Sequence, residues 1–293
     1  IWDGPRAGVE GAARDFGVDA AFPIDELEQR LPDYLQGGRR VHAMVGRGGS
    51  FDAVLLKALA TVRGRARSGA IAPTEIVDPS ATLHEMRLRK TDVELEQMRR
   101  AAGVTRDAHV EAMKATQPGK FEYQIKAEIN RVFQMGGSDR PAYDSIVGSG
   151  PNATILHYRA SGRKMEDGDL LLIDAGCELG YYASDVTRTF PVNGKFSEAQ
   201  KALYDVVLAS QIAAVDAIRP GVTLDDLHDV AARVITKGLI DHGLLQGTVD
   251  ENIQSGDYRA FFMHKTSHWI GIVVHPSLIP ILRFPRTDPL SFR

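Results

Sequence analysis

The sequence contains one cysteine, Cys177, among 293 residues. A lone cysteine excludes an internal disulfide framework and is typical of a reducing compartment, so we expect a cytoplasmic protein. No apolar stretch approaches the ~20 residues that a membrane span requires, and no signal segment of basic and then apolar residues opens the chain. These absences predict a protein that does not enter a membrane.

An excess of positive charge is also lacking, since 35 Lys and Arg face 38 Asp and Glu, a formal net charge of −3. This balance excludes the clustered basic surface that nucleic-acid binding requires. An initial methionine is missing too, because the chain opens with "IWDGPRAG", and we expect a fragment or a chain cropped at its N-terminus. The remaining composition, 43% hydrophobic and 25% charged, is ordinary for a globular protein with a sizeable core.

Three segments differ in pattern, and the sequence predicts domains over residues 1–82, 83–275 and 276–293. The first is predicted to be α/β, with strands at 41–45 and 75–78 around a helical face at 51–62. The second alternates helices and strands. Its helices are expected from Thr91 to about 117, from 121 to 137 and from 197 to 219, and its strands around "DSIVGSG", "ATILHY", "DLLLIDAG" and the arm ending at Phe190. The third is an atypical Pro-rich tail, with prolines at 276, 280, 285 and 289 that deny a helix or a central strand.

An internal repeat supports duplication within the second segment. "QPGKFEYQIKAEINRVFQMGG" and "RPGVTLDDLHDVAARVITKGL" match at six positions with a constant offset of 102 residues. The matches include Pro118 with Pro220 and Gly136 with Gly238. We therefore expect two related halves around a shared cleft, the second of them incomplete.

Two aspartates, Asp174 and Asp185, lie eleven residues apart in "LLLIDAGCELGYYASDVTRTF". A two-residue turn at Leu179-Gly180 would place them directly opposite each other, with Cβ atoms about 4.5–5.5 Å apart. A shared proton, an intervening Lys or Arg, or a divalent cation would relieve the repulsion. Arg188 is expected to face away, so the cation is favoured, and the alternative is a pair of solvated acids on an exposed hairpin.

Histidines supply the next candidates. His264, His268 and His275 lie within "MHKTSHWIGIVVH", and His157 lies in "ILHY", which we expect to be a strand before the acidic hairpin. The i, i+4 spacing of His264 and His268 is that of a helical zinc pair, but Lys265 replaces the Glu of H-E-x-x-H. We therefore expect a strand or loop there, with at least one metal ligand among the four histidines.

The stretches "LLLIDAGCELGYYASDVTRTFPVNGKFSEAQ", "YDSIVGSGPNATILHY" and "FFMHKTSHWIGIVVH" resemble the aminopeptidase P (Xaa-Pro aminopeptidase) branch of the pita-bread metallopeptidases. The resemblance covers nearly the whole chain to His275. It implies an α+β pita-bread catalytic domain, preceded by part of an α/β creatinase-like N-terminal domain. It also implies a metalloprotease that removes the N-terminal residue from a peptide with proline in second position, through a metal-activated water.

The resemblance also implies roles for individual residues. Asp174, Asp185 and His268 would be metal ligands for two Mn²⁺ ions, with Co²⁺ or Zn²⁺ as alternatives. His157 and His275 would be catalytic and substrate-binding, His264 catalytic, and Tyr143 substrate-binding. Family members often form homo-oligomers, dimers or tetramers, and the partner here would be the peptide.

One departure from the family pattern bears on activity. The family uses two glutamate ligands downstream of the His275 motif, one of them also the general base, and this chain has no glutamate after Glu251. The alternative hypothesis is thus a catalytically inactive pita-bread chain that acts as a binding or regulatory subunit. A third is another amidohydrolase of the same fold, such as prolidase or creatinase.

Overall fold

The computed structural model describes residue 4, residues 6–47 and residues 49–274. The chain divides into two compact units, residues 1–87 and 88–293, and each is described by itself. The domain limits expected from the sequence stay a prediction. In the described part of the chain, no helix combines the length and apolarity that a membrane crossing requires.

The first unit is built around a parallel strand pair. β1 (Arg40–His42) pairs in register with β2 (Glu75–Val77), and α3 (Phe51–Gly64) connects them as in a βαβ unit. The apolar face of α3 supplies most of the core, with Leu55, Ala58, Leu59 and Val62 buried. The other elements are α1 (Gly8–Phe16), η1 (Ile24–Glu26), α2 (Leu27–Leu35), η2 (Ala66–Ser68) and α4 (Ser80–Leu88).

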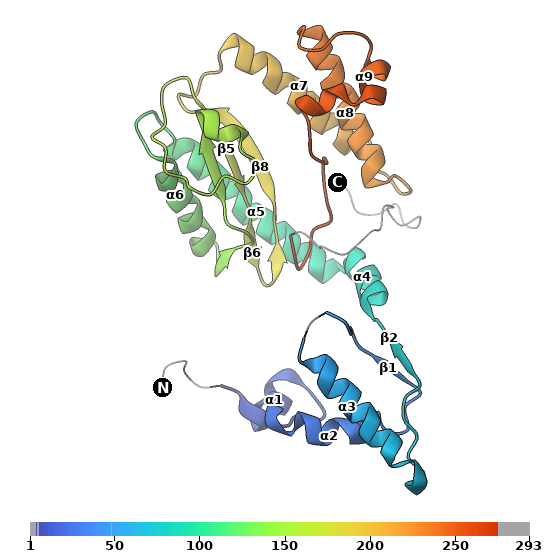
Figure 1. The fold of residues 1–293 in the computed structure, drawn as a ribbon. Helices are drawn as coiled ribbons and strands as arrows, with labels where there is room; N and C mark the ends of the chain where they lie inside the picture. The colour runs from blue at the N-terminus through green and yellow to red at the C-terminus, as the bar shows by residue number, and fades with distance from the viewer. Residues whose placement is uncertain (1–3, 5, 48, 275–293) are drawn as a thin grey trace. The chain divides into compact units, whose positions relative to one another are not determined.

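The second unit begins with two helices that cover one face of a sheet (Figure 1). α5 (Asp92–Ala115) starts after Thr91, as predicted, where Thr91 and Glu94 form a capping box, and α6 (Glu122–Met135) follows. The antiparallel sheet β4-β5-β8 contains β4 (Ile146–Ser149), β5 (Leu170–Ala175) and β8 (Val186–Pro191). A smaller antiparallel sheet, β3-β6-β7, contains β3 (Arg140–Pro141), β6 (Cys177–Leu179) and β7 (Tyr182–Ala183). The core lies between these helices and the strands, where Ile129, Phe133, Leu171 and Ile173 are buried.

The repeat predicted from the sequence has a structural counterpart in a second helix pair. α7 (Glu198–Asp216) and α8 (Leu224–Asp241) are followed by α9 (Val249–Ser255) and η4 (Asp257–Ala260). A Cβ on Gly136 would lie 2.6 Å from a methyl of Val104, and a Cβ on Gly238 would lie 2.4 Å from a methyl of Val206. The valine and the glycine of this contact are both repeated 102 residues later, so each helix pair packs through a glycine at the equivalent position.

One predicted strand is wrong. "ATILHY" forms no strand; instead a short 3₁₀ helix, η3 (Gly150–Thr154), follows β4, and His157 lies in the loop after it. The physical reason is a buried carboxylate, Glu122, which gathers this segment around itself as described below. The segment from residue 264 to residue 274 contains no helix or strand, which agrees with the loop interpretation of the histidine stretch.

Candidate active site

The acidic hairpin turns one residue later than expected. Gly180 and Tyr181 both have positive φ, 56° and 69°, as a two-residue type I′ turn requires, and Leu179 pairs with Tyr182. Leu179 is buried against the core, so it belongs to the strand and not to the turn. Asp174 consequently pairs with Thr187, and the direct opposition predicted for Asp174 and Asp185 is wrong.

The two carboxylates nevertheless stay on one face. Moving a turn by one residue moves the register by two, and side chains alternate between faces with a period of two. Asp185 lies two residues before Thr187, the partner of Asp174. Arg188 pairs with Ile173 on the other face, as expected.

A tyrosine joins the two acids. The Tyr143 hydroxyl lies 2.5 Å from Oδ1 of Asp174 and 2.8 Å from Oδ1 of Asp185. The neighbouring Ala142 amide donates to the Gly176 carbonyl at 2.8 Å, which fixes Tyr143 against the hairpin. A phenol carries one proton and can donate it to only one carboxylate at a time. Each carboxylate also has a second partner: Asp174 accepts from the Thr187 side chain, and Asp185 contacts His268.

The electrostatics reflect this crowding of negative charge. Burial raises the pKa of Asp174, and the nearby Asp185 charge raises it further, although the Tyr143 hydrogen bond lowers it. Burial and the Asp174 charge raise the pKa of the Tyr143 phenol far above its usual range, so the hydroxyl keeps its proton. A divalent cation next to the two carboxylates would offset their mutual repulsion.

His268 reaches the acids from the loop segment. Its Nε2 lies 3.1 Å from Oδ2 of Asp185, and its Nδ1 donates to the Trp269 carbonyl at 2.9 Å. The hydrogen bond to Asp185 raises the pKa of His268. A ring whose Nδ1–H is held by a carbonyl presents Nε2 as the metal-binding atom, as metal-ligating histidines usually do.

The remaining predicted residues lie differently. His157 is exposed in the loop after η3. His264 is exposed, donates from Nδ1 to the Lys265 carbonyl at 2.9 Å and meets the Phe262 ring edge-on at 5.5 Å. His275 lies outside the described residues. The structure thus brings together Tyr143, Asp174, Asp185 and His268 of the predicted site.

The donor set of two carboxylates and one imidazole suits a divalent cation chemically. Within residues 4, 6–47 and 49–274, however, no group of three or more His, Cys, Asp or Glu side chains is arranged to hold a metal ion. The Tyr143 hydroxyl lies between the two Oδ1 atoms instead. The chemical identity of the donors therefore fits a metal, and binding would require these side chains to adjust.

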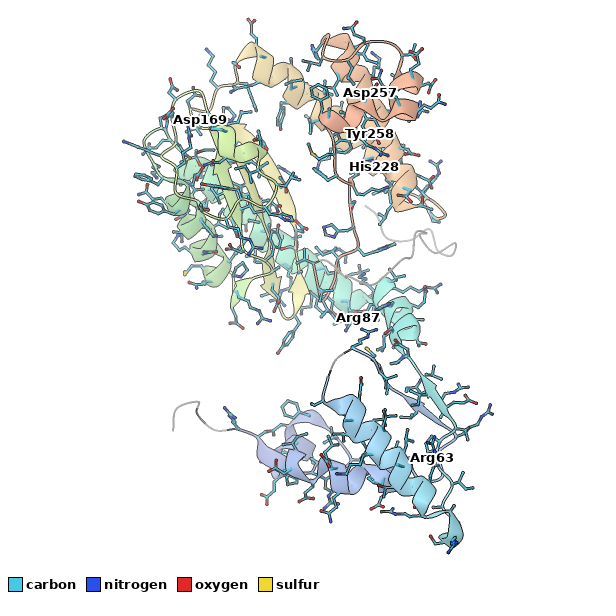
Figure 2. The ribbon with its side chains drawn as sticks, viewed as in Figure 1. Arg63, Arg87, Asp169, His228, Asp257 and Tyr258 are labelled. Carbon is cyan, nitrogen blue, oxygen red and sulfur yellow. The ribbon has the colours of Figure 1, made fainter. Side chains whose placement is uncertain are left out.

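A buried acid that sequence reasoning missed organises the His157 loop. Glu122 is fully buried and accepts five hydrogen bonds. The donors are the Ser149 amide at 2.7 Å and hydroxyl at 2.8 Å, Asn152 Nδ2 at 3.2 Å, the Tyr158 hydroxyl at 2.8 Å and the Arg163 amide at 3.0 Å. Arg163 also pairs with Asp169, which Figure 2 labels. Burial alone would raise the pKa of Glu122, but these hydrogen bonds outweigh it and hold the pKa below its usual range.

Helix α5 supplies two more residues that were missed as site residues. His109 is buried beside the acids, its positive form lowers the pKa of Asp174, and its Nδ1 donates to the Thr105 carbonyl at 3.0 Å. The Thr105 hydroxyl lies 2.6 Å from the Ser184 hydroxyl, next to Asp185. Thr105 is buried on α5, and a buried threonine carries no sequence signal for such a contact.

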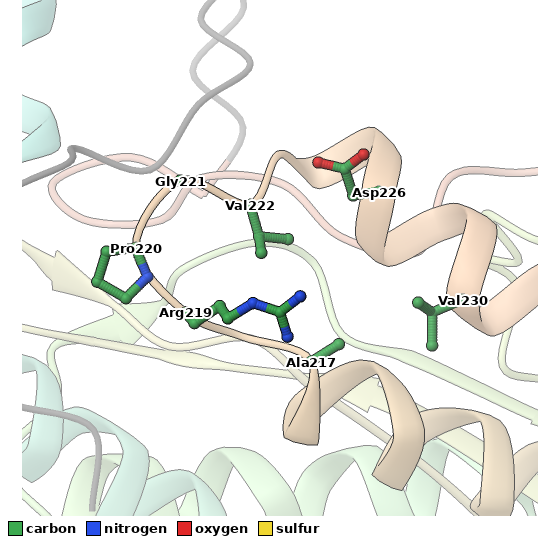
Figure 3. Close-up of a pocket in the computed structure, with 7 residues that line it drawn as sticks. All are labelled: Ala217, Arg219, Pro220, Gly221, Val222, Asp226 and Val230. Carbon is green, nitrogen blue, oxygen red and sulfur yellow. The ribbon is translucent and has the colours of Figure 1, made fainter.

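A separate pocket lies at the turn between α7 and α8 (Figure 3), away from these groups in sequence. Its lining residues are Ala217, Arg219, Pro220, Gly221, Val222, Asp226 and Val230. None of the predicted site residues is among them, so the pocket does not compete with the acidic hairpin as the candidate site.

Comparison with known proteins decides the family. The model of metallopeptidase family M24 matches residues 96–291, and that of the aminopeptidase P N-terminal domain matches residues 1–42. The chain belongs to metallopeptidase family M24. The predicted pita-bread fold, preceded by part of an aminopeptidase P N-terminal domain, is thereby confirmed.

Individual M24 relatives are similar over most of the chain. The Xaa-Pro aminopeptidase of Escherichia coli is 42% identical over 275 residues, which are 94% of this chain and 62% of the relative. An E. coli aminopeptidase P structure in complex with substrate matches with a TM-score of 0.90 at 42% identity. Pseudomonas aeruginosa aminopeptidase PepP matches with the same TM-score at 48% identity. Both structural matches cover 94% of this chain and 62% of the other, so the chain spans about three fifths of the length of these relatives.

Proposed function

We propose that this M24 chain is part of a metal-dependent aminopeptidase that removes the N-terminal residue from peptides with proline in second position. The observation that carries the proposal is that the Tyr143 hydroxyl joins Asp174 and Asp185 while the Nε2 atom of His268 contacts Asp185. The similarity to proteins named Xaa-Pro aminopeptidase supports the substrate class.

The metal ligands of this proposal are Asp174, Asp185 and His268. Their oxygen and imidazole donors suit Mn²⁺, which we propose as the metal, and also Co²⁺ or Zn²⁺. One relative, the E. coli enzyme, has been studied in a zinc-substituted form. A bound divalent cation lowers the pKa of a coordinated water and so supplies the nucleophile for peptide hydrolysis.

The chain's own residues perform the remaining tasks. Asp174 and Asp185 concentrate negative charge on one sheet face, which favours cation binding. Tyr143 holds its hydroxyl proton between the two carboxylates. The hydroxyl leaves this position when the carboxylates turn toward a cation. His157, His264 and His275, with Tyr143, would contact the peptide and the developing oxyanion.

Three further features belong to the same proposal. We expect the protein to act in the cytoplasm, because its single cysteine suits a reducing compartment. We expect a homo-oligomer, dimer or tetramer, and a catalytic domain over residues 83–275 that follows a partial N-terminal domain over residues 1–82.

The test combines metal binding with hydrolysis. Calorimetric titration with Mn²⁺ should show binding that Asp174→Asn and Asp185→Asn each abolish. Asp139→Asn, which changes an exposed aspartate, should leave binding unchanged. Hydrolysis should require proline in second position, and cleavage of tripeptides as well as dipeptides separates an aminopeptidase from a prolidase.

A folded chain that neither binds Mn²⁺ nor hydrolyses the peptide would contradict the proposal. The inactive-subunit hypothesis predicts that result, and it also predicts that Asp174→Asn does not change the function of the chain as a binding subunit.

A further inference from the structure

The ladder of backbone hydrogen bonds in the acidic hairpin is interrupted between the β5–β8 pair and the β6–β7 pair. β5 and β8 pair up to Ala175 and Val186, and β6 and β7 pair from Glu178 and Ala183. Between the ladders, the Ser184 amide donates to the Cys177 carbonyl at 2.9 Å. A regular antiparallel pair would return a bond from the Cys177 amide to the Ser184 carbonyl. That carbonyl turns instead toward Gly176, where it would lie 1.7 Å from a Cβ.

Two hydroxyls replace the missing ladder bond. The Cys177 amide lies 3.1 Å from the Thr105 hydroxyl oxygen and 3.0 Å from that of Ser184. These two oxygens are 2.6 Å apart, and the Ser184 hydroxyl lies 3.0 Å from the Cys177 carbonyl. One hydrogen arrangement satisfies every group: the Cys177 amide donates to Thr105, Thr105 donates to Ser184, and Ser184 donates to the Cys177 carbonyl.

We propose that this Thr105–Ser184 hydroxyl pair, here called the hydroxyl latch, is a positioning device that fixes the interrupted hairpin to α5 so that Asp185 joins Asp174 and Tyr143. Thr105 and Cys177 are fully buried and Ser184 is 5% exposed, so no solvent can replace the latch. Thr105 lies on α5 and Asp185 follows Ser184 directly, so the latch fixes the acid-bearing strand to the helix. Its role in metal binding rests on the proposed function, whereas its attachment of the hairpin to α5 does not.

The single cysteine provides a probe of the attachment of the hairpin to α5 that needs no metal. Cys177 is the only thiol in the chain, is fully buried and contacts the Ala101 carbonyl at 3.3 Å through Sγ. Modification of this thiol by a small disulfide reagent requires the hairpin to separate from α5. Thr105→Val removes the hydroxyl that joins α5 to the hairpin but keeps the side-chain shape, and the Cys177 amide keeps the Ser184 hydroxyl as its acceptor at 3.0 Å. We expect Thr105→Val to accelerate labelling roughly tenfold, the upper end of what the loss of one buried hydrogen bond produces.

Matched variants separate the hydroxyl from packing. Thr105→Ser keeps the hydroxyl and loses a buried methyl, and it should label within about twofold of wild type, since the latch persists. Thr236→Val makes the same substitution at another fully buried threonine, in α8, and should also stay within about twofold. Ile129→Val, in the core of α6, should lower the melting temperature without affecting the labelling rate under native conditions.

Metal affinity provides the second readout. Thr105→Val and Ser184→Ala should each weaken Mn²⁺ binding by about 10-fold to 100-fold, the usual effect of residues that orient metal ligands. Thr105→Ser and Ile129→Val should retain the wild-type affinity. A purely structural role predicts instead that affinity follows the melting temperature in all of these variants.

Labelling of Thr105→Val at the rate of Thr105→Ser would overturn the latch. Wild-type-like Mn²⁺ affinity in both Thr105→Val and Ser184→Ala would overturn its positioning role. Failure of the wild-type chain to bind Mn²⁺ would overturn the proposed function, and the labelling rates would then still decide whether the latch fixes the hairpin to α5.

Discussion

The buried carboxylate of Glu122 allows a sharp prediction for Glu122→Gln. One oxygen accepts from the amide and hydroxyl of Ser149 and from Asn152, and the other accepts from the Tyr158 hydroxyl and the Arg163 amide. A glutamine has one oxygen and one NH₂ group in place of the two carboxylate oxygens. One of the two sets of donors must therefore face the NH₂ group, which is itself a donor. The less costly orientation turns the NH₂ toward Tyr158, whose hydroxyl can accept, and toward Arg163, whose amide cannot.

The magnitude follows from that orientation. The Arg163 amide loses its acceptor, which costs about 1–3 kcal/mol for a buried group. The other bonds lose the charge of the acceptor, and hydrogen bonds to charged groups contribute about 1.5–3 kcal/mol against about 1 kcal/mol for neutral ones. We therefore expect Glu122→Gln to lower the free energy of unfolding by about 3 kcal/mol, with the His157 loop loosened first.

Chemical denaturation at neutral pH measures this loss, with Glu96→Gln on the exposed face of α5 as the control. The pH dependence gives a second check. Because the folded pKa of Glu122 is lowered, its stabilisation is present above the unfolded pKa and lost as the pH falls through the folded value. The gap between wild type and Glu122→Gln should therefore narrow below about pH 4.3. A Glu122→Gln variant as stable as Glu96→Gln at neutral pH would refute this account.

Three further predictions follow from single contacts. Gly176→Ala forces the Ser184 carbonyl to retreat from 1.7 Å to at least 3.0 Å, so we expect a loss of about 3 kcal/mol by denaturation and loss of Mn²⁺ binding by calorimetry. Asp174→Asn removes a carboxylate whose pKa is raised by burial, so the metal-free chain should melt at a higher temperature, and an unchanged or lower melting temperature would contradict this. Gly238→Ala should cost about 1–3 kcal/mol by overpacking against Val206, and Val206→Ala should recover most of that cost in a double-mutant cycle; additive costs would contradict the shared packing.

Much of the acidic hairpin was predictable because strands alternate with a period of two. Any two-residue turn near Gly180 that shifts by one residue keeps Asp174 and Asp185 on one face. The register itself was not predictable, because it depends on the burial of Leu179 and on positive φ at Tyr181. A type I′ turn at Leu179-Gly180 would require the same conformation of Leu179, which is as unusual for leucine as for tyrosine, so the turn residues alone do not choose between the two positions.

The long-range contacts of the site had no local signal. His268 meets Asp185 across more than eighty residues, and only the family resemblance indicated that the two belong together. Glu122 lies at the start of a helix, where an acid is ordinary, and its donors come from a separate loop. The same loop explains why the strand predicted at "ATILHY" does not form. Its segment makes hydrogen bonds to Glu122 in place of the backbone hydrogen bonds of a sheet.

The account depends most directly on a cation at the acidic hairpin. Crystals of the chain grown with Mn²⁺ should show an anomalous scattering peak within coordination distance of a carboxylate oxygen of Asp174, a carboxylate oxygen of Asp185 and Nε2 of His268. The Tyr143 hydroxyl should then have left its place between the two acids. Crystals saturated with Mn²⁺ that show no peak there, with Tyr143 still bonded to both carboxylates, would contradict the account.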